Sequence, residues 1–258
     1  MMRKGTPGYK YELHLHTGET SPCGRIKGAE VAGLYKAAGY DGIVVTDHYH
    51  RGYFEKNFYS RQAKQATWSE KIDKYLSGYK GALEAGKRLG LTVLLGMEIR
   101  FDGSSNDYLV YGVDEAFLRE NPELYSLGLS NFRRCLQEKL GDGQFLIYQA
   151  HPFRPGAIPA NPADLDGVEV YNGNPRHNSR NHLALHFAQK NRLKQISGSD
   201  FHRRVDLARG GMIFPEKVTT NRQLLQLLQE QQQLELIRTA GAPLSFLRLL
   251  TGIADRFK

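Results

Sequence analysis

Two histidines occur near the start of the chain as His14-Leu15-His16, at the end of an apolar segment, 9–15, that is typical of a β-strand. Side chains at positions i and i+2 of a strand lie on the same face. We therefore expect the two imidazoles to point the same way and to bind one metal ion.

Four later segments also offer side chains that bind metals, and each follows a segment typical of a β-strand. They are Thr46-Asp47-His48, Gly96-Met97-Glu98, Ala150-His151-Pro152 and Ser199-Asp200-Phe201-His202. In parallel α/β folds the carboxyl ends of the strands gather on one side of the sheet. A carboxylate can also bridge two ions, so we interpret these segments as parts of one polynuclear metal site.

The rest of the chain alternates between strand-like and helix-like segments. Strands are expected at 10–16, 42–46, 91–95, 108–111, 145–149, 167–171, 195–197 and 212–214, and helices at 28–38, 69–89, 131–140, 181–190 and 220–231. This alternation predicts an α/β fold with a mostly parallel sheet, closed or open. We interpret 49–68 as a lid, 152–162 as an ordered loop near the site, and the tail beyond Arg238 as a short amphipathic helix.

The composition is that of an ordinary globular domain. The chain has 258 residues, of which 40% are hydrophobic, and no window reaches the apolar length of a membrane span. The basic N-terminal segment has no apolar stretch behind it, and two cysteines do not indicate a disulfide framework, so we expect a cytoplasmic protein without a membrane partner. The net charge of +8 permits nucleic-acid binding, but no dense Lys/Arg tract supports it. The oligomeric state stays open.

The order of the motifs between Tyr11 and Phe214 adds a family resemblance. HLHT, VVTDH, GMEI, YLVYG, AHPF, VEVYNGN and SGSDFH together resemble the polymerase and histidinol phosphatase (PHP) superfamily. The resemblance implies one domain over 1–258, in which 215–258 complete the fold. This domain would be a distorted barrel of seven β/α units with a trinuclear metal centre at the carboxyl ends of the strands. It also implies metal-dependent hydrolysis of phosphate esters with two or three divalent ions, for which manganese, iron and zinc all fit the ligands.

The same resemblance divides the ligands among the ions. One ion would bind His14, His16, Glu98 and Asp200, a second Glu98 and His151, and a third His48 and His202. Two positions depart from the family pattern. Cys23 stands where a His or Asp often follows the first motif, and it is either a metal ligand or a small packed residue. Asp107 stands where a His often precedes the YG strand, and it is either a ligand or the cap of a turn.

Further residues are expected to surround the metals. Asp47 would hold a ligand in place by a hydrogen bond or cap a helix, and Glu169 would either hold a ligand in the same way or contact the substrate. Arginine binds phosphate well because its planar fork donates two hydrogen bonds at once. The candidates, which stand close to the motifs in the sequence, are Arg154, Arg25, Arg203 and Arg176. We consider His50 for the substrate side, whereas His177, His182 and His186 have no such support.

The sequence contains neither a G-x-S-x-G elbow nor a P-loop, so the expected nucleophile is a metal-bound hydroxide and not a side chain. The favoured substrate is a small phosphorylated molecule, namely a phosphomonoester of a metabolite or nucleotide. Alternatives on the same centre are a nuclease or nucleic-acid end-processing enzyme, a protein tyrosine phosphatase and an amidohydrolase-like enzyme. A non-catalytic metal-binding module is the alternative from another class.

Overall fold

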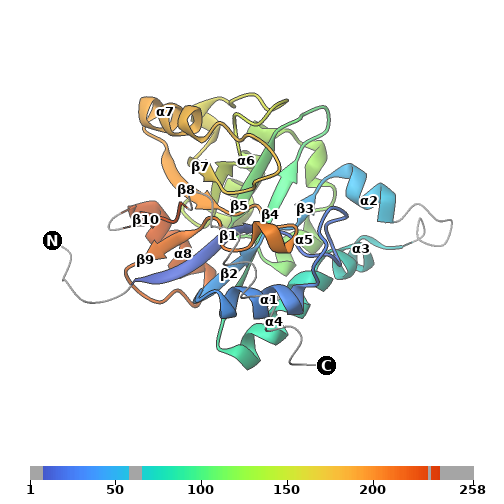
Figure 1. Cartoon of the computed structure of the whole chain (residues 1–258). Helices are drawn as coiled ribbons and strands as arrows, with labels where there is room; N and C mark the ends of the chain where they lie inside the picture. The colour runs from blue at the N-terminus through green and yellow to red at the C-terminus, as the bar shows by residue number, and fades with distance from the viewer. Residues whose placement is uncertain (1–7, 58–65, 232–233, 239–258) are drawn as a thin grey trace.

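The computed structural model describes residues 8–57, 66–231 and 234–238, and they surround one sheet that curves into a nearly closed barrel (Figure 1). The sheet has ten strands in the order β10-β9-β1-β2-β4-β5-β6-β7-β8, and β3 pairs with β4. The strands are β1 (Tyr9–Leu15), β2 (Gly42–Val45), β3 (His48–Tyr49), β4 (Thr92–Arg100), β5 (Asp107–Tyr111), β6 (Leu146–Gln149), β7 (Gly167–Asn172), β8 (Lys194–Gly198), β9 (Met212–Phe214) and β10 (Glu235–Leu236). The predicted strands are all present, but β4 extends to Arg100, beyond its expected end at 95, and β3 and β10 were not predicted.

Strand β1 lies where the barrel closes. It pairs in parallel with β2 and antiparallel with β9, and its last residues meet the segment that follows β8. The amide of His16 donates to the carbonyl of Phe201 at 2.9 Å, and the amide of Phe201 donates to the carbonyl of His14 at 3.2 Å. Closure of the barrel therefore brings the first and the last of the predicted ligand segments together.

The expectation of a mostly parallel sheet is only partly right, because the sheet is mixed. Strand β5 runs antiparallel to both β4 and β6, and β9 runs antiparallel to β1 and β10. As a result Asp107, the first residue of β5, pairs with Arg100, the last residue of β4. Because β5 runs in the opposite direction, the start of this strand lies at the same rim as the ends of the parallel strands.

Eight α-helices lie among the described residues, around the sheet. They are α1 (Gly28–Ala37), α2 (Arg51–Asn57), α3 (Trp68–Tyr75), α4 (Ser77–Leu89), α5 (Glu115–Glu120), α6 (Leu129–Leu140), α7 (Asn181–Asn191) and α8 (Asn221–Glu230). Leucines of α8, among them Leu224 and Leu228, pack with Tyr11 and Leu13 of β1 inside the barrel. Helix α8 therefore closes the end at which β1 begins, and the ligand segments lie at the other end. None of the described helices combines the length and the apolar composition needed to cross a bilayer.

Two expectations about helices need correction. The predicted helix 69–89 is two helices, which meet at Leu76, and α3 begins after Thr67 rather than at Ser69. The Thr67 hydroxyl accepts from the amide of Glu70, whose side chain accepts from the amide of Thr67, and this capping box fixes the start of the helix. Within the expected lid, 49–68, Tyr49 ends β3, residues 51–57 form α2 and Trp68 begins α3. Residues 58–65 lie outside the described residues, as does the tail 239–258.

Helices α1 and α4 cross at glycines, and this crossing also supports the first ligand segment. A β-carbon on Gly28 of α1 would lie 2.1 Å from the carbonyl oxygen of Gly78 in α4. A β-carbon on Gly78 would in turn lie 1.8 Å from the hydroxyl oxygen of Thr17, the residue after His16. Only glycine permits these approaches, so the crossing holds α4 directly against the turn that follows β1.

Substitutions in α1 test this packing. We expect Gly28→Ala to lower the free energy of unfolding by about 1–3 kcal/mol, because the added methyl group overlaps the backbone of α4. Gly33 is in the same helix with open space around its α-carbon, so Gly33→Ala should raise the free energy by about 0.5–1 kcal/mol through helix propensity. Urea denaturation measures both values. A Gly28→Ala protein as stable as Gly33→Ala would contradict the close crossing.

Candidate metal centre

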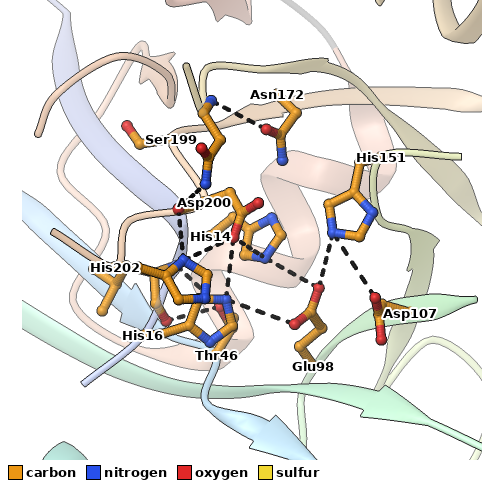
Figure 2. Close-up of polar contacts among 12 residues, drawn as sticks. His14, His16, Thr46, Glu98, Asp107, His151, Asn172, Ser199, Asp200 and His202 are labelled. Carbon is orange, nitrogen blue, oxygen red and sulfur yellow. Dashed lines mark hydrogen bonds and ion pairs between the residues drawn. The ribbon is translucent and has the colours of Figure 1, made fainter. Parts of the chain in front are cut away.

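The side chains of all five ligand segments converge at the open end of the barrel. Figure 2 shows His14, His16, Glu98, His151 and Asp200 directed toward one another. Within the described residues, four groups have ligand atoms that lie within 4.8 Å of one another. They are His16/His48/His202, His14/His16/Glu98, His14/His151/Asp200 and Glu98/Asp107/His151. Strands separated along the chain thus form one cluster of nitrogen and oxygen donors.

The carboxylate of Glu98 is at the middle of this cluster. Its Oε1 lies 3.2 Å from Nε2 of His14 and 3.3 Å from Nε2 of His151. Its Oε2 lies 3.6 Å from Nε2 of His16 and 2.6 Å from Nδ1 of His48. Each oxygen therefore faces two imidazoles, which is the arrangement that a bridging carboxylate needs.

The second carboxylate, Asp200, faces His14, near the end of β1, and His16, the residue after this strand. Its Oδ1 lies 3.5 Å from Nε2 of His14 and 3.4 Å from Nε2 of His16. Ligand bonds of about 2.1 Å at the tetrahedral angle place neighbouring donors about 3.4 Å apart. The spacing between Asp200 and both histidines is therefore that of donors around one ion.

Unpartnered atoms provide a second test of whether these residues fit a metal. Nε2 of His14, Nε2 of His16 and both carboxylate oxygens of Glu98 are buried without a hydrogen-bond partner among the described residues. Buried polar atoms of folded proteins nearly always have a partner, because losing water without replacement is costly. A cation bound between these atoms would satisfy all of them, so the residues fit a metal centre.

The electrostatics of the cluster also favour cations. Burial opposes the charged form of Glu98, but attraction to the imidazoles of His48 and His14 holds its pKa well below the usual value. Burial likewise opposes the charged form of His14, but Glu169, Asp200 and Glu98 raise its pKa well above the usual value. In the absence of metal, protons on imidazoles therefore balance the buried carboxylates.

Two of the candidate ligands are held in backbone conformations that L-residues rarely adopt. His151 has a φ of 30° and Asp200 a φ of 50°, both in the left-handed region. The amide of His151 donates to Oε2 of Glu169 at 3.0 Å, and the carbonyl of Asp200 accepts from Nδ2 of Asn174 at 3.0 Å. These hydrogen bonds hold the strained residues where their side chains face the cluster.

Glu169 and Asp47 contact ligand segments without joining any of the four groups. Oε1 of Glu169 lies 2.9 Å from Nδ1 of His14, which turns Nε2 of that ring toward the cluster. Asp47 accepts from the amide and hydroxyl of Thr17 at 2.7 and 2.6 Å and from the hydroxyl of Ser21 at 2.6 Å. Both carboxylates therefore position ligand segments through hydrogen bonds.

The sequence analysis missed Glu12, which is fully buried two residues before His14. Its Oε1 accepts from the amides of Leu13, His14 and Ser199 at 2.9–3.0 Å, and its Oε2 accepts from the hydroxyl of Tyr35 at 2.8 Å. Burial raises the pKa of Glu12 to about 7. The signal in the sequence is an acidic residue on the ligand-bearing face of an apolar strand. Glu12 ties the backbone of β1 to the segment that carries Asp200.

The sequence analysis also gave no role to His177, which contacts the candidate ligand Asp200. Its Nε2 lies 3.2 Å from Oδ2 of Asp200, and its Nδ1 lies 3.2 Å from the hydroxyl of Ser179. It follows β7, so the rule that sites gather behind strand ends also applies to it. His50 lies at the rim, where its Nδ1 accepts from the amide of Tyr53, whereas His182 and His186 are exposed on α7.

Cys23 and Asp107, the two departures from the family pattern, differ in their surroundings. Hydrogen bonds with His202 and His48 outweigh partial burial and lower the pKa of the Cys23 thiol to about 6. Cys23 is exposed and belongs to none of the four groups, so its role as a ligand stays a prediction. Asp107 belongs to one group, but arginines already occupy its oxygens.

The predicted phosphate-binding arginines also divide. Arg154 lies at the cluster, where its Nη2 is 3.1 Å from Oδ2 of Asp107. Arg176 instead pairs with Asp206 at 3.0 Å, and the same Asp206 oxygen accepts from the amide of His202. Its contact therefore supports the segment that bears His202. Arg25 and Arg203 flank this segment with exposed side chains, and their part in substrate binding stays a prediction.

Comparisons with known proteins identify the fold. No protein-family model matches the chain. No curated protein matches its sequence either. The structure is similar to PsfC from Pseudomonas syringae, with a TM-score of 0.61, 16% identity and coverage of 97% of this chain and 99% of PsfC.

A second similar structure is a two-domain protein from Bacteroides vulgatus that contains a predicted PHP-like metal-dependent phosphoesterase. The TM-score is 0.57 at 16% identity, over 92% of this chain and 69% of the other. This likeness confirms the predicted fold class, a distorted α/β barrel of the PHP type. The fold and the donor cluster together define a PHP-type barrel with a candidate metal centre at its open end.

Glu12 provides a test of how the centre is held together. Glu12→Ala leaves three buried amides without an acceptor, and each such loss costs about 1–3 kcal/mol, so the metal-free protein should lose at least about 3 kcal/mol of stability. Glu12→Gln keeps a carbonyl oxygen for these amides and should lose less. Urea denaturation of both variants, together with calorimetric Mn²⁺ titration, measures the effect. Equal stability and equal Mn²⁺ affinity in the two variants would contradict this role.

Proposed function

We propose that this protein is a metal-dependent phosphoesterase, a hydrolase that cleaves phosphate esters. The observation that carries the proposal is the set of buried donor atoms without partners on His14, His16 and Glu98. The similarity to a structure that contains a predicted PHP-like metal-dependent phosphoesterase supports the same activity. Two or three divalent ions, of manganese, iron or zinc, fit the imidazole and carboxylate donors.

The chain's own residues would divide the work. His14, His16, Glu98 and Asp200 would hold one ion, and His48 and His202 would hold another beside the second oxygen of Glu98. Bound divalent ions polarise phosphoryl oxygens and make a water molecule acidic enough to attack near neutral pH. Glu169, 2.9 Å from Nδ1 of His14, would keep Nε2 of this ring available to an ion.

Residues at the rim would bind and orient the ester. Arg154 is partly exposed beside the cluster, so its guanidinium can donate paired hydrogen bonds to phosphate oxygens. His177 is partly exposed at the rim beside Asp200, and its Nε2, 3.2 Å from Oδ2, would help to keep this carboxylate directed at the ions. Arg154 comes from the loop after β6 and His177 from the loop after β7, and both residues contact His151.

The favoured substrate is a small-molecule or nucleotide phosphomonoester. His14, His16, Glu98 and Asp200 are almost completely buried, and this supports a reacting group that projects from the end of a molecule, as a terminal phosphate does. A nuclease or end-processing activity would require these four buried side chains to reach a phosphate within a nucleic-acid strand or at its end. Oligonucleotides with and without a terminal phosphate separate these substrates in one assay.

The central experiment measures phosphate release by the purified protein loaded with Mn²⁺, Zn²⁺ or Fe²⁺. The panel contains p-nitrophenyl phosphate, nucleoside monophosphates, sugar phosphates and the two oligonucleotides. We expect release from at least one monoester, complete loss with a chelator and recovery when the metal is restored. No release from any substrate with any of the three metals would contradict the proposed function.

His151→Ala should lower kcat/KM at least about 100-fold, because it removes an imidazole that faces the bridging carboxylate. The circular dichroism spectrum should not change, since the imidazole is a side-chain ligand at the open end of the barrel. His186→Ala is the matched control, because His186 is exposed on α7. Undiminished turnover in His151→Ala would remove His151 from the centre.

A further inference from the structure

The donor group Glu98/Asp107/His151 differs from the other three in what surrounds one of its carboxylates, that of Asp107. Oδ1 of Asp107 accepts from Nε of Arg100 at 2.6 Å, and Oδ2 accepts from Nη2 of Arg100 at 2.8 Å. The same Oδ2 also accepts from Nη2 of Arg154 at 3.1 Å. Asp107 is therefore bound by two guanidinium groups, although it is 1% exposed and lies beside the ligand cluster.

These contacts leave little of Asp107 for a metal. A carboxylate has about four lone-pair directions, and the two arginines occupy three of them. Its oxygen nearest to His151 is Oδ2, at 4.0 Å from Nε2, and this is the oxygen that receives both arginines. An ion between Asp107 and His151 would have to displace a guanidinium group.

Charge opposes such an ion as well. The two guanidinium groups already balance the charges of Asp107 and Glu98, the two carboxylates of this corner next to His151. No arginine of the described residues contacts His14, His16 or Asp200, and Nε2 of His14 and Nε2 of His16 are buried there without a hydrogen-bond partner. At this rim, some donor groups need a cation, whereas the group with Asp107 already contacts two cationic guanidinium groups.

We infer that the centre binds two metal ions, and that Arg100 and Arg154 take the place of a third at the corner formed by Glu98, Asp107 and His151. Asp107 is then a positioning residue, whose carboxylate holds both guanidinium groups at the rim, and not a metal ligand. The ion count follows from the contacts alone, whereas the use of the arginine pair for phosphate rests on the proposed function.

The arginine pair suits the task that a third ion would perform. Arg100 and Arg154 have side chains that are 35% and 28% exposed, so both reach the rim while Asp107 holds them. Arg154 contacts Asp107 through Nη2 only, which leaves its other N–H groups to face an incoming anion. The pair therefore offers fixed positive charge to the phosphoryl oxygens of a bound ester.

The test counts ions in metal-stripped protein titrated with MnCl₂ in a calorimeter. We expect two Mn²⁺ per chain for the unaltered protein. The double variant Arg100→Met/Arg154→Met should bind three, because Asp107 is then free and uncompensated. Adding Asp107→Asn to this double variant should return the count to two. Arg51→Met is the matched control, since Arg51 pairs with Asp102 in the same bidentate way, and it should leave the count at two.

Three ions in the unaltered protein would overturn the inference, as would a double variant that stays at two. Loss of an ion in the single variant Asp107→Asn would also overturn it, because Asp107 would then be a ligand of the two-ion centre. Thermal unfolding confirms that each variant is folded before the titration.

The ion count needs no substrate, so it is independent of the phosphoesterase proposal. The phosphate role is tested separately by inhibition with inorganic phosphate in the Mn²⁺-loaded protein. We expect the inhibition constant to rise at least about tenfold in Arg100→Lys, because a lysine ammonium cannot hold Asp107 through two parallel hydrogen bonds. An unchanged constant would overturn the role of the pair in phosphate binding and leave the ion count in place.

Discussion

The burial of Glu98 is the constraint on which the rest of the centre depends. A carboxylate taken out of water must be compensated by positive charge or by hydrogen bonds, because the cost of leaving it alone is large. Its two oxygens face four imidazoles, which come from β1, the residue after β1, β3 and the loop after β6. The barrel is stable around this carboxylate only while protons or metal ions occupy the space between it and those rings.

The buried carboxylates of this molecule perform different tasks, and their partners distinguish them. Glu12 and Glu169 accept from backbone amides, and they fix the segments on which the ligands stand. Glu98 and Asp200 face imidazoles and have the spacing of ligands around an ion. Asp107 faces arginines. All five are buried carboxylates, so only their partner atoms distinguish a residue that supports the backbone from one that can bind a metal ion.

The closure of the barrel and the strained ligands are connected. Strand β1 meets the segment after β8 through reciprocal hydrogen bonds of His16, Phe201 and His14, and Glu12 joins the same two segments from within. Asp200 lies in that segment with a positive φ, as His151 does after β6. Several independent contacts therefore hold each ligand against its own backbone preference, which gives the centre a fixed shape.

Much of the centre was predictable because its geometry is local. The spacing of His14 and His16 fixes a shared face of a strand, and the apolar runs fix where the later ligands follow strand ends. The direction of β5, the break at Leu76 and the role of Glu12 could not be predicted in this way. Backbone alternation determines which side chains share a face, and this was in the sequence by itself. Which partners those side chains meet depends on residues far away in the chain, and that only the tertiary structure decided.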